Sequence, residues 1–241
     1  MSGLKKNILF EDDDIIVAYK PTGIATQTAR IGQQDMVSEL KNYLTKKPEQ
    51  KGKGVPYLGP VHRLDQPVSG LLVFAKTKEA AARLGRQISE GSFHKHYYAL
   101  IYGRPAKEEG RLEHYLYKDS KTNMSLVVKE DFTNAKKAVL DYKKIRTMMV
   151  LENGQEASLI EIELFTGRHH QIRVQMAEEG MSLLGDGKYG TEENKKFSRE
   201  IGCRNVALCA YKLQFKHPFT QEMMCFEELP REEIFTSFLE S

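Results

Sequence analysis

The stretch VHRLDQPVSGLLVFAK, from Val61 to Lys76, joins a short charged loop to an apolar run. The loop contains His62, Arg63 and Asp65, and the following residues 71–75 are typical of a strand in the hydrophobic core. A core strand holds the side chains just before it in fixed positions, and loops supported in this way commonly carry function. The other interpretation is a surface ion pair between Arg63 and Asp65 beside an ordinary hairpin.

The composition is compatible with one globular domain or two small ones, and we expect a single domain that spans residues 1–241. Hydrophobic residues make up 40% of the 241 residues and charged residues 29%, which is enough apolar material for a sizeable core. Lysine and arginine total 36 against 33 aspartate and glutamate, so the net charge is +3. This excess is too small to predict a nucleic-acid partner by itself. Such a partner would need a basic surface created by the distribution of the charges.

The sequence shows no signal for export and none for a bound cofactor. Its first residues, MSGLKKNILFEDDD, have no apolar core long enough for a signal peptide, and no run approaches the roughly 20 residues of a membrane span. We therefore expect a cytoplasmic protein. The GxxxxGK[ST] loop, GxGxxG after a strand, HExxH and CxxC are all absent, which is consistent with a protein that has neither a cofactor nor a metal.

Alternating and β-branched runs predict more strands than helices. Strands are expected at residues 7–10, 15–19, 71–75, 93–102, 112–117, 125–129, 135–145, 157–165, 206–215 and 222–226. Helices are expected after the caps Asp35 and Thr77, over residues 168–179, and from Pro230 to Leu239. Strands and helices do not alternate regularly, which favours an α+β fold with a mixed, mainly antiparallel sheet over a doubly wound fold.

Four motifs are spread over most of the chain. The first is HRLD, followed by a short turn, Ser-Gly and an apolar strand ending in Ala-Lys. Residues 15–23 form a short apolar run and a Lys-Pro turn, residues 95–100 read KHYYAL, and residues 167–174 and 185–190 read GRHHQIRV and GDGKYG. In this order they resemble the motifs of the RluA family of pseudouridine synthases. The resemblance implies the pseudouridine synthase fold, with helices flanking a central cleft.

The resemblance assigns the chemistry to three residues. Asp65 would be the nucleophile while uracil is detached at N1, turned and rejoined through C5, a reaction that needs no cofactor. Arg173 would keep this carboxylate ionised in a pocket shielded from water. Tyr97 would stack on the base and relay a proton at C5. Attack at C1′, attack at C6 and removal of a ribose proton all remain open.

The expected partner is a structured RNA, either ribosomal or transfer RNA, whose target uridine is flipped out. Arg63 resembles the family arginine that enters the space left by the base. The other predicted substrate contacts are His62, Lys20, Pro21, Arg168 and Gln171. The Lys-Pro motif lies close to the N-terminus, so we expect no separate RNA-binding module of the S4 type, and we expect a monomer.

Three positions depart from the family pattern, and these departures affect the expected substrate contacts and therefore the choice of RNA. Val68, His169 and Gln175 stand where relatives usually have Thr, Thr and His. The loop KKPEQKGKG at residues 46–54 directly precedes the first motif. It reads as a solvated loop, and its lysines are alternatively phosphate contacts that add salt-sensitive affinity.

Two other functions fit parts of the sequence. A binding protein on the same fold would hold or remodel RNA without chemistry, but the intact set of Asp65, Tyr97 and Arg173 argues against it. A glycosidase would need a second acid near Asp65. Asp186 is the only candidate, and its position in a glycine-rich turn favours a structural role.

Overall fold

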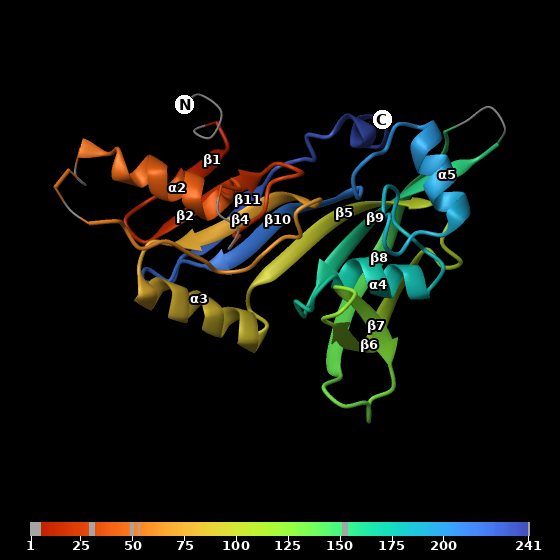
Figure 1. Cartoon of the computed structure of the whole chain (residues 1–241), viewed down its shortest axis with the longest axis horizontal. Helices are drawn as coiled ribbons and strands as arrows, with labels where there is room; N and C mark the ends of the chain where they lie inside the picture. The colour runs from red at the N-terminus through yellow and green to blue at the C-terminus, as the bar shows by residue number, and fades with distance from the viewer. Residues whose placement is uncertain (1–5, 29–31, 49–50, 53, 151–153, 241) are drawn as a thin grey trace. The chain divides into compact units, whose positions relative to one another are not determined.

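A computed structural model describes residues 6–28, 32–48, 51–52, 54–150 and 154–240 of the chain. The chain divides into two compact units (Figure 1). Unit 1 comprises Met1–His94 and Tyr211–Glu228, and unit 2 comprises Lys95–Ala210 and Leu229–Ser241. The expectation that all 241 residues act as one catalytic domain stays a prediction.

Unit 1 is built around two strands that are buried along their whole length. β2 (Ile15–Lys20) and β4 (Ser69–Ala75) pair in antiparallel fashion, and none of their residues is exposed. The hairpin predicted at the front of the sheet is confirmed, because β1 (Ile8–Glu11) pairs with β2. The short β3 (Gly59–Pro60) pairs with β4, and β11 (Met223–Glu227) pairs with β10 (Leu208–Lys216).

Two amphipathic helices flank the strands of unit 1, as Figure 1 shows. α2 (Met36–Thr45) begins after Asp35, whose Oδ1 accepts the N–H of Ser38 at 2.7 Å. α3 (Lys78–Glu90) is capped by Thr77 and ends at Gly91, which has the left-handed conformation (φ 76°). Both predicted caps are confirmed. Side-chain capping satisfies N–H groups that have no partner within the first helical turn.

Unit 2 contains a five-stranded antiparallel sheet in the order β5-β9-β8-β6-β7. Its strands are β5 (His94–Tyr102), β6 (Glu109–Asp119), β7 (Met124–Val128), β8 (Lys136–Met149) and β9 (Glu156–Leu164). Successive side chains of a strand point to opposite faces of the sheet. Lys95, Tyr97 and Ala99 are buried on one face of β5, whereas His96 and Tyr98 on the other face are half-buried.

The helices of unit 2 differ from the prediction at two places. α4 (Gln171–Glu178) packs against β6 and β7 and begins after His170, whose left-handed conformation (φ 53°) interrupts the helix. Arg168 and His169 therefore precede α4, and the helix predicted from residue 168 was placed too early. α5 (Glu192–Glu200) was not predicted, because EENKKFSRE has only one apolar residue and shows no helical periodicity.

The C-terminal helix is shorter than predicted. A 3₁₀ turn, η2 (Glu233–Phe235), leads directly into α6 (Thr236–Leu239). Phe235 in η2 and Phe238 in α6 are both buried, so the predicted apolar face is present over a shorter stretch. The described residues as a whole form the predicted α+β fold with a mainly antiparallel sheet. No helix among them is both long and apolar enough to cross a membrane.

Candidate active site

The loop that contains Asp65 is fixed by the core strand behind it, as the sequence predicts. All seven residues of β4 are buried, and Val68 donates its backbone N–H to the carbonyl of Asp65 at 3.0 Å. This contact closes a tight turn between the loop and the strand. Asp65 itself is partly exposed. A carboxylate on a turn attached to a buried strand keeps its position while it can still reach a substrate.

A second segment of unit 1 holds the same loop from the other side. Thr26 Oγ1 donates to the carbonyl of Leu64 at 2.9 Å and accepts the N–H of Leu64 at 3.1 Å. Gly23 and Gln66 exchange two further bonds, each of 2.9 Å, through the Gly23 N–H and the Gln66 amide. Asp65 is thus flanked on both sides by residues whose backbone is fixed by hydrogen bonds.

Lys20 has a clear structural role at this junction. Its side chain is fully buried, and its ammonium donates to the carbonyls of Pro21, Ile24 and Gln66 at 3.0, 2.6 and 3.1 Å. A buried ammonium requires such partners. Lys20 therefore binds the Lys-Pro turn to the loop of Asp65. A direct contact of Lys20 or Pro21 with substrate stays a prediction.

His62 and Arg63 differ in their surroundings. The ring of His62 packs edge-on against Phe93, with centroids 5.6 Å apart, and Phe93 stacks on Phe215 at 5.0 Å. His62 is therefore tied to the aromatic core of unit 1. Arg63 is exposed. A side chain that enters an RNA helix must start from the surface, and Arg63 meets this requirement.

In unit 2, Arg173 forms a buried ion pair that the sequence did not predict. Its Nε and Nη2 donate to Oδ2 and Oδ1 of Asp186, each at 2.7 Å, and the two side chains are only 5% and 0% exposed. The guanidinium also lies 5.2 Å from the ring centre of Tyr189. The forked geometry fixes the plane of the guanidinium. Asp65 belongs to unit 1 and Arg173 to unit 2, and their pairing stays a prediction.

Asp186 is held in a glycine-rich turn, as the sequence favoured. Its Oδ1 also accepts the backbone N–H groups of Lys188 and Tyr189 at 3.0 and 3.2 Å. The preceding Gly185 has φ 71°, and a Cβ at this position would lie 1.9 Å from the carbonyl oxygen of Asn205. Only glycine fits there. Asp186 is thus committed to Arg173 and to its own turn, which argues against a role as the second acid of a glycosidase.

Gln171 organises the loop before α4. The side chain is buried, its Oε1 accepts from Thr166 Oγ1 at 2.7 Å and from the Arg168 N–H at 3.0 Å, and its Nε2 donates to the Val139 carbonyl at 3.1 Å. Arg168 is exposed and donates from Nε to the Lys137 carbonyl at 3.0 Å. Gln171 therefore positions Arg168. A substrate contact by either residue stays a prediction.

Two histidines beside this loop form a fixed pair that sequence reasoning did not identify. The rings of His169 and His170 stack with centroids 3.7 Å apart. Ser125 Oγ donates to the His169 carbonyl at 2.7 Å and lies 3.0 Å from His169 Nδ1, so Nδ1 carries a proton that it donates to Ser125. His170 Nδ1 lies 2.8 Å from Tyr189 Oη. The unusual His-His sequence was the available signal.

Tyr97 is buried on β5, opposite Ile162 of β9. Its neighbour Tyr98 points to the other face of the sheet, as the alternation of the strand predicts. Lys95, two residues before Tyr97, is buried on the same face. Tyr97 and Lys95 therefore share one side of this strand.

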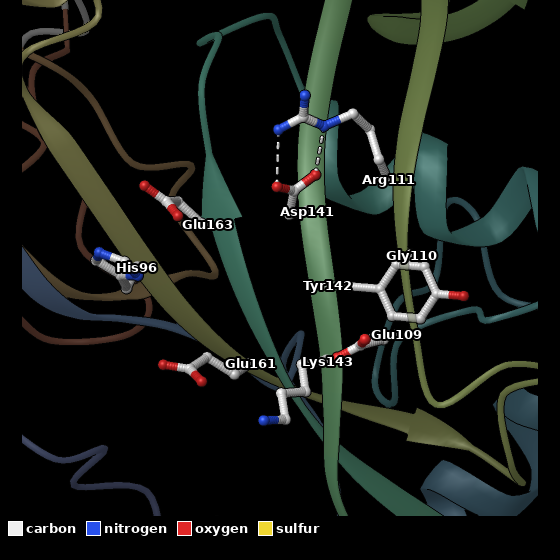
Figure 2. Close-up of a pocket in the computed structure, with 9 residues that line it drawn as sticks. All are labelled: His96, Glu109, Gly110, Arg111, Asp141, Tyr142, Lys143, Glu161 and Glu163. Atoms are coloured by element: carbon white, nitrogen blue, oxygen red, sulfur yellow. Dashed lines mark hydrogen bonds and ion pairs between the residues drawn. The ribbon is translucent and has the colours of Figure 1, made fainter.

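The other face of the unit 2 sheet carries an open, acidic pocket of about 460 Å³ (Figure 2). Arg111 and Asp141 form a bidentate ion pair there at 2.7 and 2.8 Å. Three further carboxylates line the pocket and are Glu109, Glu161 and Glu163. Four carboxylates against the two cations Arg111 and Lys143 make this pocket unfavourable for phosphate groups.

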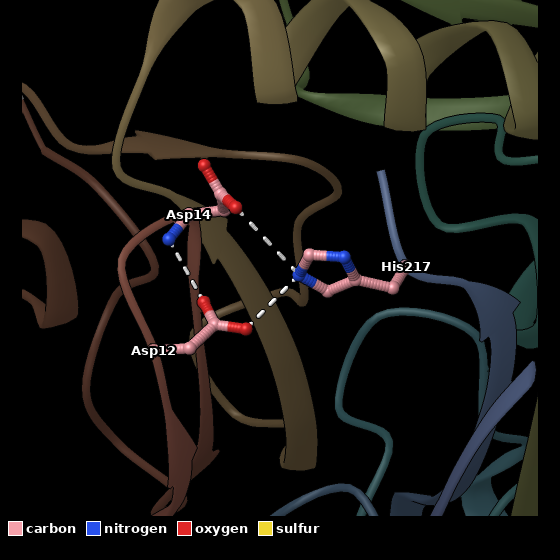
Figure 3. A group of neighbouring side chains, drawn as sticks. All are labelled: Asp12, Asp14 and His217. Carbon is pink, nitrogen blue, oxygen red and sulfur yellow. Dashed lines mark hydrogen bonds and ion pairs between the residues drawn. The ribbon is translucent and has the colours of Figure 1, made fainter. Parts of the chain in front are cut away.

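Asp12, Asp14 and His217 come close enough together to suggest a cation site (Figure 3). His217 Nε2 lies 2.9 Å from Asp12 Oδ2 and 3.9 Å from Asp14 Oδ2. However, Nδ1 of the same ring accepts the backbone N–H of Thr220 at 3.1 Å, so the proton of the neutral ring is on Nε2. A metal needs a lone pair on the nitrogen that it binds. The cluster is therefore a hydrogen bond between two turns of unit 1.

Comparison with known proteins shows the class of enzyme to which this chain belongs, an isomerase that acts on uridine in RNA. The family model described as RNA pseudouridylate synthase matches residues 14–178. "Ribosomal large subunit pseudouridine synthase D" of Zymomonas mobilis is 35% identical over 230 residues, which cover 93% of this chain and 69% of the relative. "Dual-specificity RNA pseudouridine synthase RluA" of Vibrio parahaemolyticus is 32% identical, covering 88% of this chain and 78% of the relative. This chain belongs to the RluA family of RNA pseudouridine synthases.

Solved structures agree with this family at the level of the fold. The structure titled "Human RNA Pseudouridylate Synthase Domain Containing 4" matches with a TM-score of 0.72 at 22% identity, over 95% of this chain and 90% of that one. "Human RNA Pseudouridylate Synthase Domain Containing 1" matches with a TM-score of 0.70, over 96% and 85% of the two chains. The predicted pseudouridine synthase fold is confirmed.

Proposed function

We propose that this enzyme isomerises one or a few uridines of large-subunit ribosomal RNA, with Asp65 as the nucleophile. The relative from Zymomonas mobilis is named for the large ribosomal subunit, and its similarity covers 93% of this chain and 69% of the relative. The observation that carries the proposal is the loop of Asp65, a carboxylate on a turn that is fixed by β4 and by the segment from Lys20 to Thr26. The target uridine would be flipped out, and Arg63 would fill the vacated space.

The rigidity of this loop suits the chemistry. The reaction requires a carboxylate that acts at the ribose or the base and an intermediate that survives while the base turns. Small displacements of a reacting group reduce rates strongly. The hydrogen bonds around Leu64 and Gln66 keep the backbone of Asp65 in place before the substrate binds.

Arg173 would act as the cation that keeps Asp65 ionised. Asp186 occupies the Nε and Nη2 donors of its guanidinium, so a second carboxylate would be served from Nη1. A guanidinium has five donors in a fixed plane, which allows it to serve two carboxylates at once. In this arrangement Asp186 positions Arg173, and Arg173 positions Asp65.

Tyr97 would relay the proton that leaves C5. Replacing Tyr97 with phenylalanine keeps the buried ring on β5 and removes only the hydroxyl. We expect kcat to fall by about 10²- to 10⁴-fold, the range typical of general acid–base catalysis, with little change in KM for RNA. Steady-state kinetics of Tyr97→Phe and of Tyr98→Phe as the control test this. An equal loss in both variants would contradict the role of Tyr97.

The basic loop at residues 46–54 provides a separate prediction, although residues 49–50 and 53 lie outside the described residues. Lys46 and Lys51 are exposed, whereas Lys47 forms an ion pair with Glu11 at 2.7 Å. Charge reversal at Lys46 and Lys51 should reduce the slope of log affinity against log salt by about 1.4 to 1.8, because each phosphate contact contributes about 0.7 to 0.9. Lys143→Glu, on the acidic face, is the control. An unchanged slope would exclude the loop from RNA binding.

The substrate is tested by mapping pseudouridine in total RNA from cells with and without the gene. We expect one or a few uridines of large-subunit ribosomal RNA to remain unmodified when the gene is absent. Loss of pseudouridine from transfer RNA alone would show that the ribosomal assignment is wrong. An unchanged map in all RNA would contradict the proposed function.

A further inference from the structure

Lys95 is a buried cation without a counter-charge. Only 4% of the residue is exposed, and no described residue accepts a hydrogen bond from its ammonium or forms an ion pair with it. Lys20, the other buried lysine among the described residues, has three carbonyl partners. Burying most of a lysine side chain is unfavourable when no carboxylate neutralises its ammonium. Lys95 therefore has a reason to be present other than the stability of the fold.

The surroundings of Lys95 make the charged form of its side chain less favourable. The pKa of Lys95 falls to about 8, first because burial disfavours the charged form and second because the Arg168 guanidinium acts on it. Arg168 is the charged group whose field reaches the ammonium. Its Nε is held by the Lys137 carbonyl at 3.0 Å, so the two cations are kept in proximity. A group whose pKa is shifted by burial and by a specific charged neighbour is a candidate for a functional site.

The loop above Lys95 leaves room for such an anion. A Cβ at Gly167 would lie 3.9 Å from the Lys95 ammonium, and the glycine has no side chain to occupy that position. Lys95 also lies two residues from Tyr97 on the same face of β5. Two residues of a strand span about 7 Å. This is comparable with the distance between a base and a phosphate of its own backbone.

We propose that Lys95 and Arg168 together bind one phosphate group of the RNA backbone, adjacent to the uridine that is isomerised. The phosphate supplies the negative charge that both cations lack. Contacts of this kind position an RNA without reading its sequence. The alternative anion is the uracil that is detached during the reaction, which would carry its charge on an oxygen near Lys95. One such charge would account for Lys95, but not for the second, exposed cation Arg168.

The proposal rests on the function proposed above, and affinity and stability test it independently of the chemistry at Asp65. The variants are Lys95→Met, Lys95→Arg and Arg168→Met, with Lys143→Met as the control on the acidic face. The probe is an unmodified transcript of large-subunit ribosomal RNA, bound at several salt concentrations. We expect Lys95→Met and Arg168→Met each to reduce the salt slope by about 0.7 to 0.9, whereas Lys95→Arg and the control retain the slope of the original protein.

Stability and pH give two further readouts. Lys95→Met should raise the Tm at pH 7, because it removes a buried charge without counter-charge. The folded protein releases the Lys95 proton near pH 8, whereas the unfolded chain keeps it to about 10.5, so unfolding takes up a proton between these values and stability rises with pH there. Affinity for the transcript should fall as the pH rises through about 8 in the original protein and stay constant in Lys95→Met.

Two results would overturn the proposal. A Lys95→Met variant with a lower Tm and an unchanged salt slope would make Lys95 a structural residue. An unchanged slope together with a loss of kcat of about 100-fold or more would place the anion on the uracil and not on the backbone. A lower slope, a higher Tm and a lost pH dependence in the same variant would establish the phosphate site.

Discussion

Asp65→Asn is expected to lower the rate of pseudouridine formation by about 10⁴-fold or more, because an amide is not a nucleophile and no other carboxylate is assigned to replace it. The variant should fold normally. The hydrogen bonds that fix the loop come from Thr26, Gln66 and backbone groups. Single-turnover reactions on unmodified ribosomal RNA, followed by nucleoside analysis, measure the rate, and Tm and RNA affinity measure the integrity of the protein.

Asp13→Asn is the matched control, since Asp13 is an exposed aspartate of the same unit. It should retain full activity. Formation of pseudouridine by Asp65→Asn at a rate near that of the control would remove Asp65 from the mechanism. Loss of folding in Asp65→Asn would show instead that the carboxylate is needed to hold the loop. The variants Asp65→Glu and Asp65→Ser would then distinguish this structural role of Asp65 from its role in the reaction.

Asp186→Leu is expected to have the largest effect on stability. It leaves the buried Arg173 guanidinium without its bidentate partner and removes the acceptor of two backbone N–H groups. Breaking a buried ion pair from one side costs about 3–5 kcal/mol. For a chain of this size, this corresponds to a fall in Tm of roughly 6–20 °C. Activity should fall as well, because Arg173 would lose its fixed orientation.

A bidentate arginine–aspartate pair also exists at the surface, and it supplies the control for Asp186→Leu. Arg111 and Asp141 form a bidentate pair of similar length, but both side chains are substantially exposed (Figure 2). Asp141→Leu should change Tm little, because exposed ion pairs contribute little. The double variant Arg173→Met with Asp186→Leu should regain part of the lost stability and none of the activity. Equal effects of Asp186→Leu and Asp141→Leu on Tm would contradict the account.

Much of the fold could be predicted, because its signals are local. The apolar run of β4 is buried on both faces, and the caps Asp35, Thr77 and Gly91 lie where the helix boundaries are. These features depend on residues a few positions apart. α5 was not predicted because its sequence is polar, and besides its single apolar residue, Phe197, it buries the polar Asn194 and Ser198.

The parts of the site that could not be predicted depend on contacts between distant segments. The start of α4 is set by the left-handed His170, whose ring contacts Tyr189 nineteen positions later. The pairing of Arg173 with Asp186 crosses 13 positions and required the fold of the glycine-rich turn. Lys95 shares the strand face of Tyr97, so its burial could have been inferred from the alternation of β5. Its lack of a counter-charge could not.

The central claim is that this protein breaks the bond between N1 of uracil and the ribose in RNA and rejoins the uracil through C5. This claim has one direct test. Ribosomal RNA labelled with tritium at uridine C5 is incubated with the purified protein, and the tritium released to water is compared with the pseudouridine formed. The account predicts one tritium released for each pseudouridine formed, and no release with Asp65→Asn. RNA that is bound tightly but releases no tritium would contradict it and leave an RNA-binding protein on the same fold.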